Sequence, residues 1–195
     1  MAWDFGYTKE EEAYRQKVAA FLDRELTEEI ARQNWEDLGL GKEGRAFGRK
    51  LYEAGLLGWS WPVEYGGKGL SPVYDFILID ELGKRWSAHV PNDVAYTMVG
   101  HTILRRGSEA MKKEFIPRIV RGEIEFGLGY TEPEAGSDLA NMKMTAIDQG
   151  DHYLVNGQKT FNTESHYADY HWLAAKTDLK ASPYKGISLF IVDQR

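Results

Sequence analysis

The sequence predicts an α+β protein in which an all-α amino-terminal domain is followed by a β-domain. Up to Gly122, apolar residues recur at helical spacing between residues that typically begin and end helices. After Gly122, short runs of β-branched and aromatic residues are separated by turn residues. Because the helices precede the strands and do not alternate with them, we expect two domains, covering residues 1–126 and 127–195.

The first predicted helix begins with a capping box, in which Thr8 and Glu11 satisfy each other's backbone N–H groups. A second helix is expected over residues 42–54, and Gly55 ends it because glycine readily adopts the left-handed conformation that follows many helices. The apolar stripe of the first helix has the spacing of one continuous face and consists of Tyr14, Val18, Phe21, Leu22, Leu26 and Ile30.

Three more helices are predicted before the β-domain. Ser71 as the cap and Pro72 in the first turn favour a helix start at that point. A fourth helix is expected over residues 93–106 and a fifth over 108–122, where Pro117 favours a kink. The expected core face of the third helix, which includes one polar position, consists of Val73, Phe76, Ile77, Asp80 and Leu82.

Short strands and turns are predicted in the β-domain. Asn156-Gly157 predicts a two-residue hairpin turn, because both residues tolerate positive φ. Residues 148–151, which include Gly150, predict another turn. The expected strands cover residues 143–147, 153–155, 160–161, 170–174 and 187–192.

The composition argues against several classes of function. The net charge is −6, so a nucleic-acid binder, which needs a basic surface for phosphate, is not expected. The chain has no cysteine, which excludes disulfides and thiolate metal sites. No apolar run approaches the roughly 18 residues of a membrane span, and residues 1–12 resemble neither a secretory signal nor a transit peptide. We therefore expect a cytoplasmic protein without a membrane span.

The histidines do not predict a metal site. His166, Asp169 and His171 lie close together in the sequence, but their spacing matches no common ligand motif. No Gly-x-Gly-x-x-Gly motif follows a predicted strand, so a Rossmann dinucleotide site is not indicated either.

The stretch over residues 127–138, GLGYTEPEAGSD, differs from the rest of the chain. Gly129 and Gly136 allow a ligand to approach the backbone closely. Thr131 and Ser137 add hydroxyl groups beside free backbone N–H groups. Such donors suit a carbonyl oxygen or the edge of a reduced flavin, where negative charge develops. The residues alone fit an ordinary turn equally well, because turn-forming residues dominate the stretch.

This stretch resembles the first signature of the acyl-CoA dehydrogenase family, Thr-Glu-Pro-x-Ala-Gly-Ser-Asp, at all seven defined positions. The likeness covers nearly the whole chain, because other segments resemble the family in the same order. They are Trp-Pro-x-x-Tyr-Gly-Gly at 61–67, Gly-Ser-Glu at 107–109, Asn-Gly-Gln-Lys at 156–159, Ala-Asp at 168–169, Lys-Gly-Ile-Ser at 185–188 and Phe-Ile-Val at 190–192.

The resemblance implies both a fold and a reaction. The fold would combine the helical domain, an antiparallel β-barrel-like middle domain and a carboxy-terminal four-helix bundle, in a homo- or hetero-oligomer. The reaction would be the FAD-dependent α,β-dehydrogenation of an acyl-CoA thioester, with electron-transfer flavoprotein as the acceptor. The spacing over residues 156–193 resembles that of members acting on bulky or degradative acyl-CoAs, in fatty acid or steroid side-chain degradation.

Carried over by position, the resemblance assigns cofactor contacts to the glycine-rich loop. Tyr130 and Thr131 would supply backbone and hydroxyl contacts to the pyrimidine edge of the flavin. Gly136 would allow close approach, and Ser137 would touch both the cofactor phosphate and the substrate. Glu132 is structural in the family, so we assign it no chemistry.

Two further cofactor contacts are implied in the next segment. Phe161 lies where the family commonly has a tryptophan against the flavin, and Thr163 would place its hydroxyl near flavin N5. Asn162, Glu164 and the aromatic Tyr130 depart from the family pattern, which would weaken a flavin site. A carboxylate at Glu164 near the flavin would lower its potential, but charged residues are mostly exposed and we expect this one to face solvent.

The catalytic glutamate of the family belongs to the carboxy-terminal bundle, which would follow Arg195. We therefore expect a partial middle domain, assign no catalytic residue in this chain, and expect the isolated chain to be inactive.

Two alternative functions stay open. One is a flavin monooxygenase or oxidase of the same superfamily, distinguished by the reaction of its reduced flavin with oxygen. The other is a non-catalytic subunit, distinguished by failure to hold FAD even beside its partner.

Overall fold

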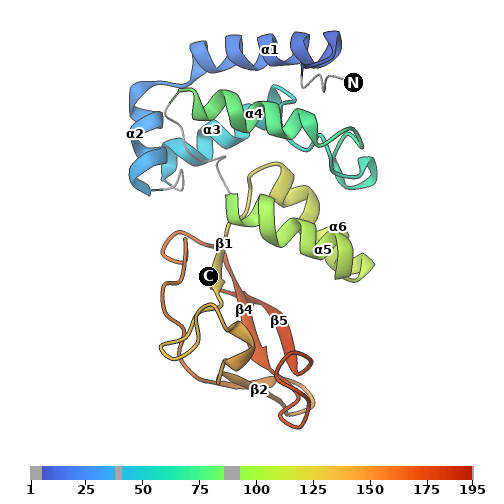
Figure 1. The fold of residues 1–195 in the computed structure, drawn as a ribbon, viewed down its shortest axis with the longest axis vertical. Coiled ribbons are helices and arrows are strands. Elements are labelled where there is room, and N and C mark those ends of the chain that lie inside the picture. Colours follow the sequence, from blue (N-terminus) through green and yellow to red (C-terminus); the bar gives the residue numbers. More distant parts are fainter. Residues whose placement is uncertain (1–5, 38–40, 86–92, 195) are drawn as a thin grey trace, which may run out of the picture. The chain divides into compact units, whose positions relative to one another are not determined.

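The computed structural model describes residues 6–37, 41–85 and 93–194. They divide into two compact units, and the division falls between Glu123 and Ile124. Helices make up the first unit and the β-sheet belongs to the second (Figure 1). The predicted fold class, a helical domain followed by a β-domain, is confirmed.

The described part of the helical unit contains α-helices, a π-helix and the short 3-10 helix Val63–Tyr65. Within the described ranges, no helix combines the length and the apolar character needed to cross a membrane. The helices are α1 (Lys9–Glu25), α2 (Glu28–Asp37), α3 (Lys42–Glu53), α4 (Val73–Gly83), a π-helix (Val94–Gly100), α5 (His101–Arg106) and α6 (Glu109–Val120).

The start of α1 confirms the predicted capping box. The Thr8 hydroxyl accepts a hydrogen bond from the Glu11 N–H at 3.2 Å, and the Glu11 carboxylate accepts one from the Thr8 N–H at 2.7 Å. The helix ends earlier than the apolar stripe indicates, because Leu26 has an extended backbone. Ile30 is buried as expected, but from α2.

Helix α4 corrects the predicted core face. Ile77 and Leu82 are buried as expected, but Phe76 is 56% exposed. Leu78 and Glu81 are buried instead. The segment is apolar on most of its circumference, so periodicity alone does not select one face, and packing against the neighbouring helices decides it.

The fourth helix forms where it was predicted, and over Val94–Gly100 it is a π-helix that leads into α5. The wide turns present Tyr96 and Gly100 to Trp61. The Trp61 ring stacks on Tyr96 with 4.7 Å between ring centroids. A Cβ atom on Gly100 would lie 2.2 Å from the Trp61 ring, so this helix leaves space for the indole.

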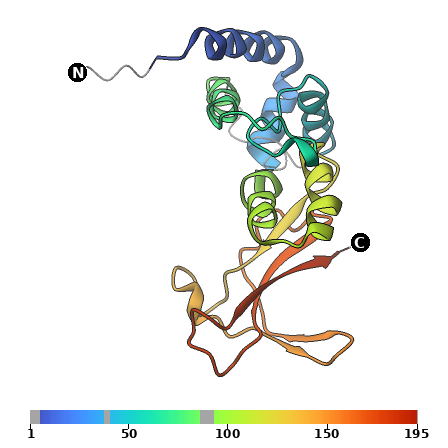
Figure 2. The same cartoon turned by 90° about the vertical axis from the view of Figure 1, so that its right-hand side faces the viewer.

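Within the described part of the second unit, the strands form one mixed sheet. Strand β4 pairs in parallel with β1 and antiparallel with β5, and β2 pairs antiparallel with β3. Thr145 of β2 also pairs in parallel with Lys176 of β4. Figure 2 shows the β2–β3 hairpin, in orange, diverging from the β4–β5 pair. The strands are β1 (Phe126–Gly129), β2 (Thr145–Asp148), β3 (Tyr153–Asn156), β4 (Tyr170–Lys176) and β5 (Ile187–Asp193).

This pairing corrects the purely antiparallel arrangement that we expected. Strands β1 and β4 are joined through the β2–β3 hairpin and a long connection, and such a crossover brings two strands side by side in the same direction. The described strands do not close into a barrel.

The two predicted turns have different outcomes. The turn over residues 148–151 joins β2 to β3, and the Gly150 N–H donates to the Asp148 carboxylate at 2.8 Å. The hairpin at Asn156-Gly157 was wrong, because β3 ends at Asn156 and no paired strand follows directly. Gly157 is needed for close approach instead, since a Cβ atom there would lie 2.7 Å from the Met144 backbone. The strand expected over residues 160–161 is not formed.

Candidate functional site

Two segments that are distant in the sequence lie side by side after β1. The Thr160 N–H donates to the Thr131 carbonyl at 2.8 Å, and the Leu128 N–H donates to the Thr163 carbonyl at 2.9 Å. These bonds lie on either side of Phe161 along the chain. The structure therefore brings together Thr131, Phe161 and Thr163, three of the residues predicted to bind the cofactor.

A tight turn holds the rest of the glycine-rich loop. The Glu132 N–H donates to the Ala135 carbonyl at 2.9 Å, and the Ala135 N–H donates back to the Glu132 carbonyl at 3.2 Å. Gly136 and Ser137 follow this turn and are exposed. A Cβ atom on Gly136 would meet no other atom within 4 Å, so a ligand has free access to its backbone.

Beneath the loop lies a buried ion pair between Glu132 and Lys159, whose side chains are 5% and 4% exposed. The Lys159 ammonium lies 2.8 Å from the Glu132 carboxylate. The backbone N–H groups of Lys143 and Met144 donate to the same carboxylate at 2.5 and 2.9 Å. Burial opposes the charged form, but these donors outweigh it and hold the pKa of Glu132 below its usual range. Glu132 is therefore a structural residue, as expected.

Tyr130 offers its backbone to a ligand more readily than its side chain. Its hydroxyl accepts a hydrogen bond from the Trp172 indole at 2.8 Å, and the ring is partly buried against β4. Burial raises the pKa of the Tyr130 hydroxyl, and the bond from Trp172 partly offsets that rise. The large side chain at this position thus packs on the sheet.

Phe161 has an unusual conformation. Its φ is 52°, in the left-handed region, and its side chain is 87% exposed. The left-handed conformation costs a residue with a Cβ atom roughly 1 kcal/mol. Thr163, two residues later, is also exposed. The chain thus holds an aromatic ring in solvent at an energetic cost, beside a free hydroxyl group.

Glu164 was expected to face solvent, and this expectation was wrong. Its φ is 64° and the residue is only 5% exposed. The sharp turn explains the outcome, because the Ser165 N–H donates back to the Asn162 carbonyl at 3.3 Å and the chain reverses. Phe161 then points outward while Glu164 turns inward.

Several buried polar atoms in this segment lack a hydrogen-bond partner among the described residues. They include the Thr160 hydroxyl, the Asn162 side-chain carbonyl and Nε2 of His171. His171 lies over Gly129, where a Cβ atom would be 2.2 Å from Nε2. Burial lowers the pKa of His171, and the Lys159 charge lowers it further, which favours the neutral imidazole. The described residues contain no group of three acidic, histidine or cysteine side chains arranged for a metal ion.

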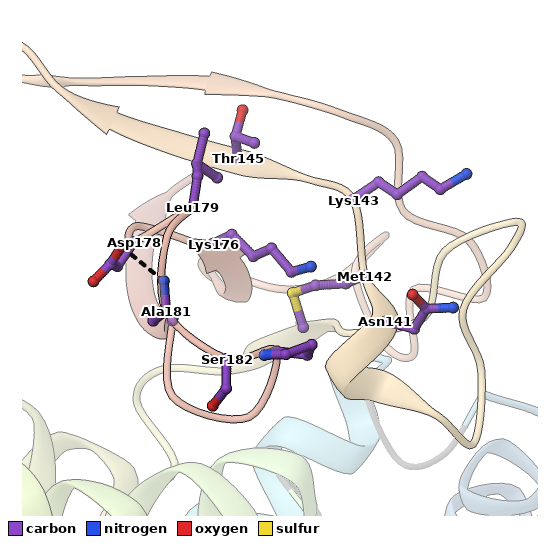
Figure 3. A pocket seen from close by; sticks show the side chains of 11 residues that line it. Asn141, Met142, Lys143, Thr145, Lys176, Asp178, Leu179, Ala181 and Ser182 are labelled. Carbon is purple, nitrogen blue, oxygen red and sulfur yellow. Dashed lines mark hydrogen bonds between the residues drawn. The ribbon is translucent and has the colours of Figure 1, made fainter.

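A cavity of about 370 Å³ lies in the β-unit between residues 141–145 and the loop over 176–186. Figure 3 shows the Lys176 side chain reaching across it toward Met142, whereas Lys143 points away. Lys143 instead pairs with the exposed Glu134. Inside the loop, the Asp178 carboxylate accepts a hydrogen bond from the Ala181 N–H at 3.1 Å.

Comparisons with known proteins agree on one family. Residues 8–123 match the family model for the acyl-CoA dehydrogenase N-terminal domain, and residues 127–195 match the model for its middle domain. Acyl-CoA dehydrogenase FadE29 of Mycobacterium tuberculosis is 48% identical over 156 residues, which cover 80% of this chain and 40% of the relative.

Two solved structures are also similar. The ChsE4-ChsE5 complex from Mycobacterium tuberculosis matches with a TM-score of 0.84 and 38% identity, over 98% of this chain and 48% of the matched chain. The Tcur3481-Tcur3483 steroid ACAD matches with a TM-score of 0.85 and 36% identity, over 98% of this chain and 49% of the matched chain. The chain thus spans about half the length of the proteins that it matches.

Proposed function

Because the chain belongs to the acyl-CoA dehydrogenase family, whose members are FAD-dependent oxidoreductases, we propose that it forms part of an FAD site for the α,β-dehydrogenation of an acyl-CoA thioester. One observation carries the proposal. An exposed aromatic ring in a costly backbone conformation, Phe161, lies in a segment hydrogen-bonded to the loop over residues 130–137.

The exposed groups have the chemistry that a flavin requires. The Phe161 ring offers an apolar face for stacking on a planar heterocycle. Thr131 and Thr163 offer hydroxyl groups, and Gly136 and Ser137 offer an open backbone suited to a phosphate or to a polar ring edge. The unpartnered buried polar atoms of the same segment are a further sign that it is built for polar contacts. These residues fit FAD.

In this proposal the chain binds and orients the cofactor, and the cofactor oxidises the substrate. Bound FAD would accept the hydride from the substrate β-carbon. Tyr130, through its backbone, and Thr131 would hold the polar edge of the flavin. Thr163 would offer its hydroxyl to the ring system, and Phe161 would stack on it and exclude water. Ser137 would contact both the cofactor and the substrate. None of the residues in this chain is proposed to remove the α-proton.

We further propose that the cavity beside Lys176 accepts part of the CoA group. Its volume of about 370 Å³ suits a fragment of the nucleotide, and the ammonium that crosses it suits a phosphate. The similarity to a steroid enzyme supports a bulky acyl group, such as a steroid side chain, as the substrate.

Two partners complete the proposal. Both similar structures are named for a pair of proteins, which supports a hetero-oligomer in which a second subunit contributes to the site. An electron-transfer flavoprotein is the proposed electron acceptor, following the family's reaction.

The test is a titration of the purified chain with FAD, followed by its visible absorbance. We expect the flavin bands to shift and gain structure relative to free FAD. Phe161→Ala should weaken binding roughly tenfold, the size of one lost stacking contact. Tyr184→Ala is the matched control, because Tyr184 is also highly exposed, at 79%, but lies in another loop. Unchanged flavin bands with the wild-type chain would overturn the proposal.

A further inference from the structure

Lys159 has no assigned role, yet its ammonium is the most enclosed charge beside the glycine-rich loop. Its side chain is 4% exposed. The ammonium donates to the Glu132 carboxylate at 2.8 Å and to the backbone carbonyl of Tyr130 at 3.0 Å. The second contact matters here, because it falls on the peptide group between Tyr130 and Thr131, inside the proposed flavin site.

We propose that Lys159 is a positioning residue for the cofactor: it holds and polarises the Tyr130–Thr131 peptide, so that the Thr131 N–H is presented to the flavin. The inference rests on the proposed function and deepens it. It assigns the electrostatics of the cofactor edge to a residue that does not itself touch the cofactor.

The contact between Lys159 and the Tyr130 carbonyl fixes the direction of the Thr131 N–H. In a planar trans peptide the C=O and N–H bonds point in opposite directions. With the Lys159 ammonium on the Tyr130 carbonyl, the Thr131 N–H points away from the lysine. Within the described residues no hydrogen-bond acceptor is found for that N–H. The next peptide group along the chain is also held, because the Thr131 carbonyl accepts a hydrogen bond from the Thr160 N–H at 2.8 Å.

The Lys159 ammonium also polarises the Tyr130–Thr131 peptide group. A cation on a carbonyl oxygen draws electron density along the peptide and makes the attached N–H a stronger donor, an effect that is larger in a buried, low-dielectric setting. The Glu132 carboxylate opposes part of this effect, and the N–H groups of Lys143 and Met144 that donate to it reduce that opposition. A stronger donor favours the reduced flavin, whose pyrimidine edge gains negative charge.

The chain offers a set of variants that separates this role from simple support of the fold. Lys159→Met removes the ammonium but leaves Glu132 buried and without its cation. The double variant Lys159→Met/Glu132→Gln removes both charges and thereby the destabilising lone carboxylate. Lys143→Met is the matched control, because it also breaks a lysine–glutamate pair beside the loop, but one with side chains 70% and 68% exposed.

Each variant is titrated with FAD, its urea midpoint is measured, and the midpoint potential of its bound flavin is compared with that of the wild-type chain. We expect Lys159→Met to bind FAD roughly tenfold more weakly, about the effect of one charge-assisted hydrogen bond. Its bound flavin should also have a lower potential. The double variant should recover the urea midpoint without recovering affinity or potential, and Lys143→Met should match the wild type.

The opposite results overturn the inference. If the double variant regains FAD affinity and potential together with stability, or fails to fold, Lys159 serves only the fold. If Lys159→Met behaves like Lys143→Met, the lysine has no role toward the cofactor. Failure of the proposed function is distinct, because the wild-type chain itself would then leave the flavin bands unchanged.

Discussion

Glu81 is buried in the helical unit and Glu132 in the β-unit, and the two carboxylates are held differently. In the helical unit, Glu81 of α4 contacts the side chains of Arg15, Lys84 and Arg85 at 3.1, 2.8 and 2.7 Å. In the β-unit, Glu132 pairs with the Lys159 ammonium and also accepts hydrogen bonds from the backbone N–H groups of Lys143 and Met144.

The difference follows from what the surrounding backbone needs. Helices satisfy their own backbone groups, so the ions around Glu81 connect elements that are already formed. A loop has no such internal ladder, and its buried N–H groups need other acceptors. Glu132 supplies them, and the rest of the loop keeps exposed groups free for a ligand. Ions stabilise helix packing in one unit and hold the backbone of the proposed flavin site in the other.

The largest effect on stability is expected at the buried pair. Lys159→Met should lower the free energy of unfolding by about 3 kcal/mol, because the buried Glu132 carboxylate loses its ammonium partner. Lys143→Met should change it by less than about 0.5 kcal/mol, since its pair is exposed. Urea denaturation of both variants measures the difference. Equal losses would mean that burial does not distinguish the two pairs.

The helical network should respond to pH. Burial opposes the charge of Glu81, but Lys84, Arg85 and Arg15 together lower its pKa from 4.5 to about 2. A folded-state pKa below the unfolded value gives stability that is complete above about pH 5 and is lost as the pH falls toward 2. Glu81→Gln should therefore lower the free energy of unfolding by about 2 kcal/mol at pH 7 and by much less near pH 2. The figure is smaller than the pKa shift alone would give, because the cations around Glu81 are partly exposed and solvent screens them.

Urea midpoints of the wild type and the variant at both pH values measure this effect. Glu114→Gln, at an exposed position of α6, is the control and should show no such dependence. A deficit of Glu81→Gln that is as large near pH 2 as at pH 7 would mean that packing of the side chain, and not its charge, stabilises α4.

The smallest effect on stability has the opposite sign. Phe161→Asn should raise the free energy of unfolding by up to about 1 kcal/mol, since asparagine tolerates the left-handed conformation. The lost phenylalanine ring was already exposed and contributes little to folding. The same variant should bind FAD more weakly. Calorimetric unfolding with Tyr184→Asn as the control tests this, and a stability loss on Phe161→Asn would refute the strain argument.

Local signals in the sequence predicted the fold where short-range interactions decide it. The capping box at Thr8 depends on a neighbour three residues away, and it forms as predicted. The fifth predicted helix likewise begins directly after Ser108. The predicted strands that became β2 to β5 lie within a few residues of their observed bounds. Likewise, the signature over residues 131–138 located the loop that the structure brings beside Phe161.

Longer-range packing decided the features that the sequence did not predict. The buried face of α4 and the π-helix at Val94–Gly100 depend on neighbouring segments, among them the Trp61 ring. The hairpin predicted at Asn156-Gly157 does not form, because Gly157 packs closely against Met144. Nothing in the local sequence marks Lys159 as buried, because its partner Glu132 lies 27 residues earlier.

The most direct test of the account is hydrogen–deuterium exchange of the chain with and without FAD, resolved to short peptides. We expect slower exchange in two separate stretches, residues 129–138 and 159–165. The proposed flavin site is built from both, and their backbone groups exchange readily because they are exposed or held only by local hydrogen bonds. The helical peptide over residues 9–25 is the internal control and should not change. Protection confined to other segments, or no protection at all, would contradict a flavin site at this place.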